Sequence, residues 1–190
     1  MTRGCGPWGA RASIAGAAAF VLVVATLHGL QPSYDPASQL MSELALGPHG
    51  WAMLPAFAGL AVSAAGICVA LAGLRASKLL TGLLWAASAL FLLSGLFPLG
   101  ETSTIHIAAI ASAFIVSVLA IYLFPSLGGD AAPLASRPFS WSCAAGIAMS
   151  VGLGHSVLPM GIGQRMAAGF LLLWFVVVAW RLLRRAPRTV

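Results

Sequence analysis

The sequence predicts an all-α fold, a polytopic membrane protein built as a compact bundle of six transmembrane helices. Of its 190 residues, 60% are hydrophobic and only 7% are charged, whereas a soluble domain carries about 25% charged residues because its surface faces water. Several apolar stretches also approach the roughly 20 residues that cross the hydrocarbon core as a helix. Nothing in the composition marks a separate soluble part, so we expect a single transmembrane domain over residues 1–190.

Six segments fit a membrane span, and the prolines agree with their ends. Pro138 suits the first turn of a helix, where its missing N–H is not needed. We interpret the basic start and first apolar run as an uncleaved first span, because five more spans follow it. The expected spans are residues 12–30, 51–74, 79–99, 105–124, 138–158 and 166–183.

Small residues spaced along two of these spans favour close helix packing, as is common between membrane helices. They are Gly59, Ser63 and Gly66 in the second span, and Gly146, Ser150 and Gly154 in the fifth.

The basic residues predict the orientation of the helices. Cytoplasmic loops carry an excess of Lys and Arg, and nine of the ten basic residues fall on one side of this topology, with Arg165 alone opposite. Both termini are therefore expected in the cytoplasm, and the protein in the plasma membrane. The excess of basic residues that gives the net charge of +6 would orient the helices and contact anionic lipid headgroups. A nucleic-acid partner is not expected.

The first outside loop, Gln31 to Gly50, is the longest connection and is expected to contain a short helix. Asp35 is a good N-cap and Pro36 a good first helical residue, and Gly47-Pro48 would end the helix. On such a helix Leu40, Met41 and Leu44 would share one face, and Ser38 and Ser42 another. The segment would lie in the membrane interface or fold over the mouth of the bundle.

Acidic and histidine side chains gather at or near the expected outer face, which makes it the candidate site. Ionisable groups within spans usually face the interior or a water-filled cavity, and a carboxylate beside a histidine can perform acid–base chemistry. The candidate catalytic residues are Glu43, Asp35, His106 and His155. The candidate substrate-binding residues are Tyr34, Ser38, Ser42, Arg165, His28 and Trp51.

Three of these residues also have a purely structural interpretation. Asp35 caps a helix, Glu43 meets water, and Arg165 locks the last span to the loop through a salt bridge. No cofactor is expected. A metal at the histidine and carboxylate cluster would need tertiary convergence, because no His-x-x-x-His spacing prepares a site. Gly-rich phosphate loops and nucleophile-elbow motifs are missing from the sequence.

Short motifs along nearly the whole chain resemble a bacterial family catalogued as domain of unknown function 998. The resemblance implies a small, roughly six-span membrane protein, supports the location of the site, and carries no established activity. Two positions depart from the family pattern, since Leu99-Gly100-Glu101 replaces an earlier acidic residue and Gln164 replaces a frequent Glu. The matching residues are Tyr34-Asp35-Pro36, Ser38-Gln39, Ser42-Glu43-Leu44, Gly50-Trp51, Phe97-Pro98 followed by His106, and Gly163-Gln164-Arg165.

Three functions are compatible with this pattern. The first is an accessory protein that binds lipids or a partner and uses the polar cluster structurally. The second is an intramembrane enzyme that acts on a lipid or isoprenoid-like substrate. A transporter fits less well, because no charged residue lies in the middle of a span. Membrane lipids are the expected partners, an apolar small molecule is a further candidate, and the oligomeric state stays open.

The predicted orientation can be tested by cysteine labelling of intact cells. In a variant without the native cysteines, an impermeant thiol reagent should label Ala37→Cys, in the outside loop, and should not label Ser77→Cys, in a cytoplasmic loop. Labelling of position 77 but not of position 37 would reverse the orientation.

Overall fold

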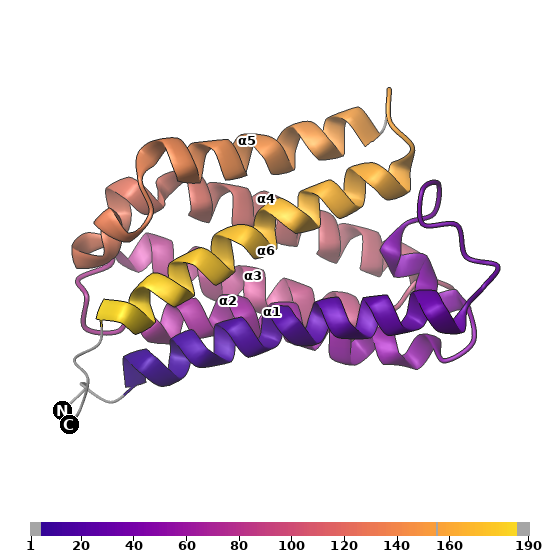
Figure 1. Cartoon of the computed structure of the whole chain (residues 1–190), viewed down its shortest axis with the longest axis horizontal. Coiled ribbons are helices and arrows are strands. Elements are labelled where there is room, and N and C mark those ends of the chain that lie inside the picture. Colours follow the sequence, from indigo (N-terminus) through magenta and orange to yellow (C-terminus); the bar gives the residue numbers. More distant parts are fainter. Residues whose placement is uncertain (1–4, 155, 186–190) are drawn as a thin grey trace.

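The computed structural model describes residues 5–154 and 156–185, and six α-helices run back and forth along one long axis (Figure 1). They are α1 (Cys5–Leu30), α2 (Met53–Ala70), α3 (Lys78–Leu96), α4 (Ser103–Leu127), α5 (Arg137–Gly154) and α6 (Met160–Arg185). The described residues contain no strand, as expected for a chain whose backbone must bond internally in lipid. Three short 3-10 helices lie in the connections: η1 (Met41–Leu46), η2 (Gly50–Ala52) and η3 (Gly129–Leu134).

Five of these helices are long and apolar enough to cross a membrane, which supports a multi-pass membrane protein. They are α1, α2 (counted with η2), α3, α4 and α6. Helix α5 falls outside this set, and its 18 residues include Arg137, Pro138, three serines and three glycines. Its 18 residues nevertheless extend about 27 Å at 1.5 Å per residue, and it lies along α6 and α4 (Figure 1).

The two ends of the bundle differ in chemistry. At the terminal end, where α1 begins and α6 ends, the connections from α2 to α3 and from α4 to α5 meet (Figure 1). There Arg75 lies 3.9 Å from Asp130, and Arg181 donates to the carbonyl of Leu134 at 2.6 Å. At the loop end, residues 31–50 connect α1 to α2.

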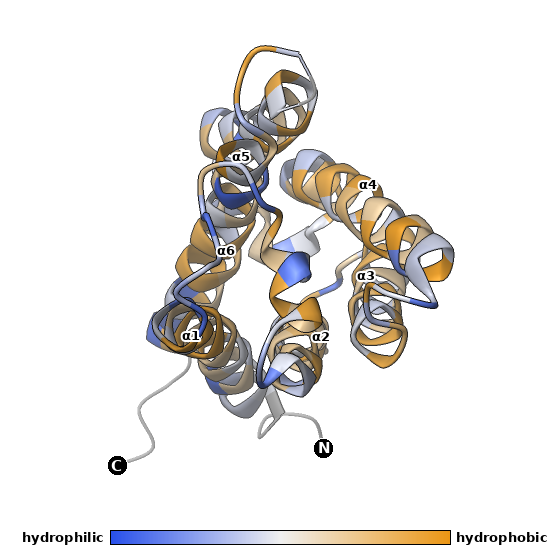
Figure 2. Ribbon diagram, turned by 90° about the vertical axis from the view of Figure 1, so that its right-hand side faces the viewer, coloured by the Kyte–Doolittle hydropathy of each residue, from blue (hydrophilic) through white to orange (hydrophobic). Residues whose placement is uncertain are grey.

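Figure 2 views the molecule from that end, and helices α2, α3 and α4 are mostly hydrophobic along their length.

Helices α1 and α2 approach backbone to backbone, as the small residues of the second span predicted. A Cβ added to Gly59 would lie 2.6 Å from the carbonyl oxygen of Gly16, and one on Gly66 would lie 2.5 Å from that of Gly9. Between these points, the buried Ser63 hydroxyl donates to the Ser13 carbonyl at 2.9 Å. Close backbone approach and interhelical hydrogen bonds of this kind hold membrane helices together where lipid gives no hydrophobic driving force.

The small residues of the fifth span serve the same purpose against α6. A Cβ on Gly146 would lie 2.7 Å from the ring of Phe170, and one on Gly154 would lie 3.3 Å from the Cα of Gly163. Pro138 lies in the first turn of α5, as predicted.

The predicted helix in the connection between α1 and α2 begins later than expected. It is the 3-10 helix η1, so Asp35 is not its N-cap. Asp35 instead closes a local turn, in which its carboxylate accepts from the Ala37 N–H at 3.0 Å and the Ser38 hydroxyl at 2.5 Å. Aspartate commonly bonds its own downstream backbone in this way. Gly47 follows the last residue of η1, as predicted.

The later start also changes which residues share a face. Met41 and Leu44 are buried together, as expected, but Ser38 and Ser42 do not form a common surface. Ser38 belongs to the exposed turn, and Ser42 is buried at 3% exposure.

The contact between α1 and α2 leads to a stability prediction. Gly66→Ala should lower the free energy of unfolding by about 1–3 kcal/mol, because the added methyl meets backbone atoms that cannot move aside. Thermal unfolding in detergent measures this. Gly82→Ala on α3 is the matched control, since an added Cβ there meets nothing within 4 Å. If the two variants unfold alike, the close approach of α1 and α2 does not limit stability.

Candidate functional site

The loop end is organised around Arg165, which lies in the second turn of α6. One terminal nitrogen of its guanidinium donates to the carbonyls of Gln39 at 3.0 Å and Gly161 at 2.9 Å. The other donates to the Tyr34 hydroxyl at 2.5 Å and contacts Nε2 of His28 at 3.0 Å. These four contacts use all the hydrogens that the two terminal nitrogens carry. We call Arg165, His28 and Tyr34, with the Gln39 carbonyl, the arginine network.

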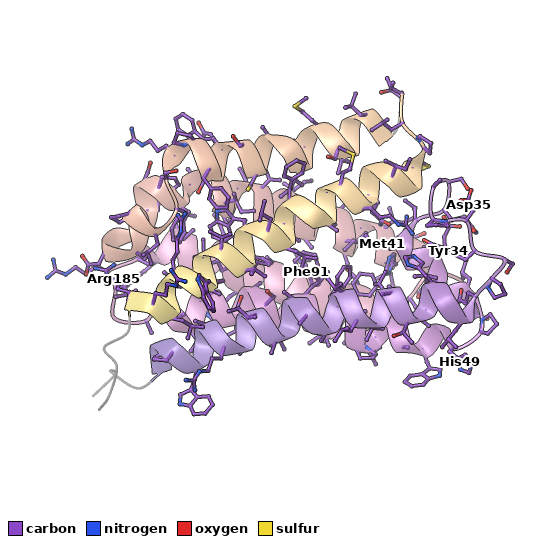
Figure 3. All side chains as sticks on the ribbon, viewed as in Figure 1. Tyr34, Asp35, Met41, His49, Phe91 and Arg185 are labelled. Atoms are coloured by element: carbon purple, nitrogen blue, oxygen red, sulfur yellow. The ribbon has the colours of Figure 1, made fainter. Side chains whose placement is uncertain are left out.

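Aromatic stacking adds to the arginine network. The rings of His28 and Tyr34 stack at 5.2 Å between centroids with an angle of 25°, and the Arg165 guanidinium lies 5.5 Å from the centre of the Tyr34 ring. Desolvation raises the pKa of Tyr34 above its usual value, so the phenol keeps its proton at neutral pH. That proton is directed to the carbonyls of Gln39 and Leu40, at 3.2 and 2.9 Å. Figure 3 shows Tyr34 beside Asp35 at this end of the molecule.

The first turn of α6 also binds the loop segment, residues 31–50. The Ile162 N–H donates to the carbonyl of Ala37 at 3.1 Å, so a carbonyl dipole meets the positive end of the helix. Gly161 makes this possible, because a Cβ there would lie 2.6 Å from the carbonyl oxygens of Pro36 and Ala37.

Two glutamines complete the attachment, and sequence reasoning gave neither a role. Gln31 is 4% exposed, and its amide donates to the carbonyls of Leu44 at 2.9 Å and Pro48 at 2.8 Å. The side-chain oxygen of Gln164 accepts from the Met41 N–H at 2.5 Å. A polar amide at the end of an apolar span was the available signal, because such a group must find a partner near hydrocarbon.

The predicted catalytic carboxylates bond to their own segment. Glu43 accepts from the Leu40 N–H at 3.0 Å and from the Gln39 amide at 3.2 Å, which caps the start of η1. Asp35 is exposed, and hydrogen bonds from the Ser38 hydroxyl and then the Ala37 N–H lower the pKa of its carboxyl group. Within residues 5–154 and 156–185, no carboxylate lies within salt-bridge distance of Arg165. The expected lock between α6 and the loop therefore uses neutral acceptors.

His106 lies apart from the arginine network. It is buried on α4, and its Nδ1 lies 2.8 Å from the Ser94 carbonyl and 3.1 Å from that of Phe97, at the end of α3. Its ring meets Phe57 edge to face at 5.4 Å. Nε2 is buried without a hydrogen-bond partner in the described residues. His155 lies outside the described residues, so the structure does not place it.

Two hollows lie near the loop segment, and they differ in size. A cavity of about 20 Å³ lies beneath η1, where Met41 and Ser42 face Phe57, Phe114 and other apolar side chains. That volume holds about one water molecule. A groove of about 300 Å³ runs along α1 and is bordered by η2. Trp51, predicted to bind substrate, belongs to this groove and is 76% exposed.

No group of three or more His, Cys, Asp or Glu side chains comes together in the part of the chain that the structure describes. The arginine network brings together three of the predicted binding residues, because the Arg165 guanidinium contacts both His28 and Tyr34.

Comparison with known proteins identifies the family. The family described as protein of unknown function, DUF998, matches residues 14–181. The chain belongs to this family. No curated protein and no solved structure matched the chain. The motifs at residues 34–44 and 163–165, which carried the resemblance in the sequence, lie within this match and include residues that attach the loop segment to α6.

Removing the Arg165 guanidinium should release the loop segment from α6. Arg165→Met leaves the Gln39 carbonyl and the Tyr34 and His28 side chains without their charged donor, which should lower the free energy of unfolding by about 1.5–3 kcal/mol. Limited proteolysis should then cut within residues 31–50.

Arg184→Met is the matched control for this test. Arg184 lies on the same helix at the terminal end, where it is exposed and stacks on Trp180 at 4.9 Å. We expect its loss to change stability by less than about 1 kcal/mol. Equal stability and equal protease resistance of Arg165→Met and the wild type would contradict a holding role for Arg165.

Proposed function

We propose that this DUF998 protein is a six-span plasma-membrane protein that binds lipids as an accessory component and performs no chemistry at its polar cluster. In this proposal both termini are cytoplasmic, α5 is the sixth span, and the loop end faces outward. The single observation that carries the proposal is the use of Arg165, whose terminal nitrogens are all bonded to the protein's own loop segment and to His28.

The charge distribution supports the orientation. Of the ten basic residues, Arg3 and Arg188 lie outside the described part, which leaves eight. Arg165 is at the loop end. The other seven lie on or beside the helix ends that meet at the terminal end: Arg11, Arg75, Lys78, Arg137, Arg181, Arg184 and Arg185. A seven-to-one excess is the asymmetry that marks a cytoplasmic face. Helix α5 begins at that face and ends beside the start of α6, which supports a sixth crossing.

The enzyme alternative has weaker support. Acid–base catalysis needs a titratable group within hydrogen-bond reach of a substrate, and ligand pockets usually enclose about 300–1,000 Å³. The cavity beneath η1 provides about 20 Å³, and neither Glu43 nor Asp35 lines it. Glu43 instead caps its own 3-10 helix. Of the two hollows, only the groove bordered by Trp51 reaches the size of a ligand site.

The test compares wild type and Glu43→Gln in proteoliposomes made from isotope-labelled lipid extract. We expect the lipid composition to stay unchanged with either protein, since the carboxylate acts as a cap. Glu43→Gln keeps one acceptor oxygen and should cost about 0.5–1 kcal/mol of stability. Native mass spectrometry should find phospholipid retained on the wild type.

Two results would argue against the proposal. A new lipid species that appears with the wild type and not with equally folded Glu43→Gln would support the enzyme alternative. A wild-type protein that retains no phospholipid through purification would contradict the lipid-binding role.

A further inference from the structure

The groove along α1 is lined mostly by apolar side chains. Five of the lining side chains come from one side of α1, and Trp51 and Ala52 line the groove at the loop end. Leu27 is buried at 2% exposure, whereas Leu22 and Leu30 are 67% and 49% exposed. The α1 residues are Leu22, Val23, Thr26, Leu27 and Leu30. Because α1 packs on α2 and α6, these exposed positions lie on the perimeter of the bundle.

One end of this groove is polar. His49 lines the groove, is itself exposed, and directly precedes η2. Its backbone is in the left-handed region at φ 62, a conformation that non-glycine residues adopt infrequently. Figure 3 shows His49 at the loop end, below α1 and at the edge of the molecule. The imidazole and the neighbouring indole of Trp51 each carry an N–H donor. Both side chains combine an apolar ring with a polar tip, which suits a membrane interface.

We infer that this groove binds one acyl chain of a phospholipid, whose phosphate lies against His49 and Trp51. The inference rests on the proposed lipid-binding function and assigns its site. An apolar body along the span, followed by N–H donors at the interface, is complementary to an acyl chain followed by a phosphate.

The groove of about 300 Å³ is large enough for a small ligand. A hydrocarbon chain is much thinner than a helix and can lie along the whole row of α1 side chains. A partner helix is the competing occupant, and it would cover residues 22–30 and keep an acyl chain away from them.

The test uses the full chain in lipid nanodiscs that contain phosphatidylglycerol with a photoreactive diazirine on one acyl chain. After irradiation, peptide mass spectrometry locates the labelled residues. We expect labelling to concentrate at residues 22–30 and 49–52. Thr26→Trp places an indole in the groove at an exposed position and should reduce this labelling about fivefold or more, because a filled pocket leaves no room for the chain.

Two further variants make the result specific. Ile115→Trp adds the same indole at a position on α4 that is 62% exposed and should leave labelling unchanged. His49→Ala should reduce labelling by phosphatidylglycerol, while labelling by a diacylglycerol with the same diazirine chain stays the same. Should Thr26→Trp fail to fold, Trp51→Ala removes one wall of the groove and should lower the labelling as well.

The outcomes separate this inference from the proposed function. Labelling spread evenly around the bundle, while native mass spectrometry still finds retained phospholipid, would overturn the groove site and leave the lipid-binding function standing. Loss of all retained phospholipid would overturn both. Equal effects of Thr26→Trp and Ile115→Trp would also overturn the site, because the indole would then act only through its general contact with lipid.

Discussion

The loop end depends on one constraint, the need of the backbone of residues 31–50 for hydrogen-bond partners close to hydrocarbon. A buried N–H or C=O without a partner costs about 1–3 kcal/mol. Gln31, the first residue of the segment, and Gln164 and Arg165 on α6 meet the need, and each bonds main-chain groups of the segment. The segment therefore lies against the bundle without forming a continuous α-helix, and its own Met41 and Leu44 are buried.

The choice of neutral partners for Arg165 follows from where it lies. A carboxylate in the same place would have to lose its own hydration, and in a poorly hydrated site that cost can exceed the attraction between the charges. Carbonyls, a phenol and an imidazole cost less to desolvate, and together they bond all the hydrogens of the two terminal nitrogens. Asp35 and Glu43 are then left to stabilise the turn and the 3-10 helix of their own segment.

The sequence predicted the helices well because their signals are local, and predicted the site less well because its contacts are not. Gly59, Ser63 and Gly66 could be recognised as a packing stripe from their spacing alone. Gln39, His28 and Tyr34, three of the four partners of Arg165, lie more than 120 positions away, and no pattern indicates whether a cation will meet a carboxylate or a carbonyl. Asp35 was assigned to the wrong helix start because the same side chain caps helices and closes turns equally well. His106 was placed in the cluster from its level in the membrane, but its direction around α4 turns it towards α3.

Gln164 shows what the loop end requires of its residues. Its contact with the Met41 N–H uses only an acceptor oxygen, which a glutamate at this position would also supply. Gln164 in place of the frequent Glu therefore preserves the bond between α6 and the loop segment. Residues 49–52, at the end of the segment, turn towards α2. Gly50 packs on the backbone of Ala45, where a Cβ would come within 2.5 Å of the carbonyl carbon, and the left-handed turn at His49 leads into η2. Residues 34–44 thus hold the segment to α6, and residues 49–52 present Trp51 at the perimeter. The packing of Gly50 on Ala45 and the two bonds of Gln31 join these halves.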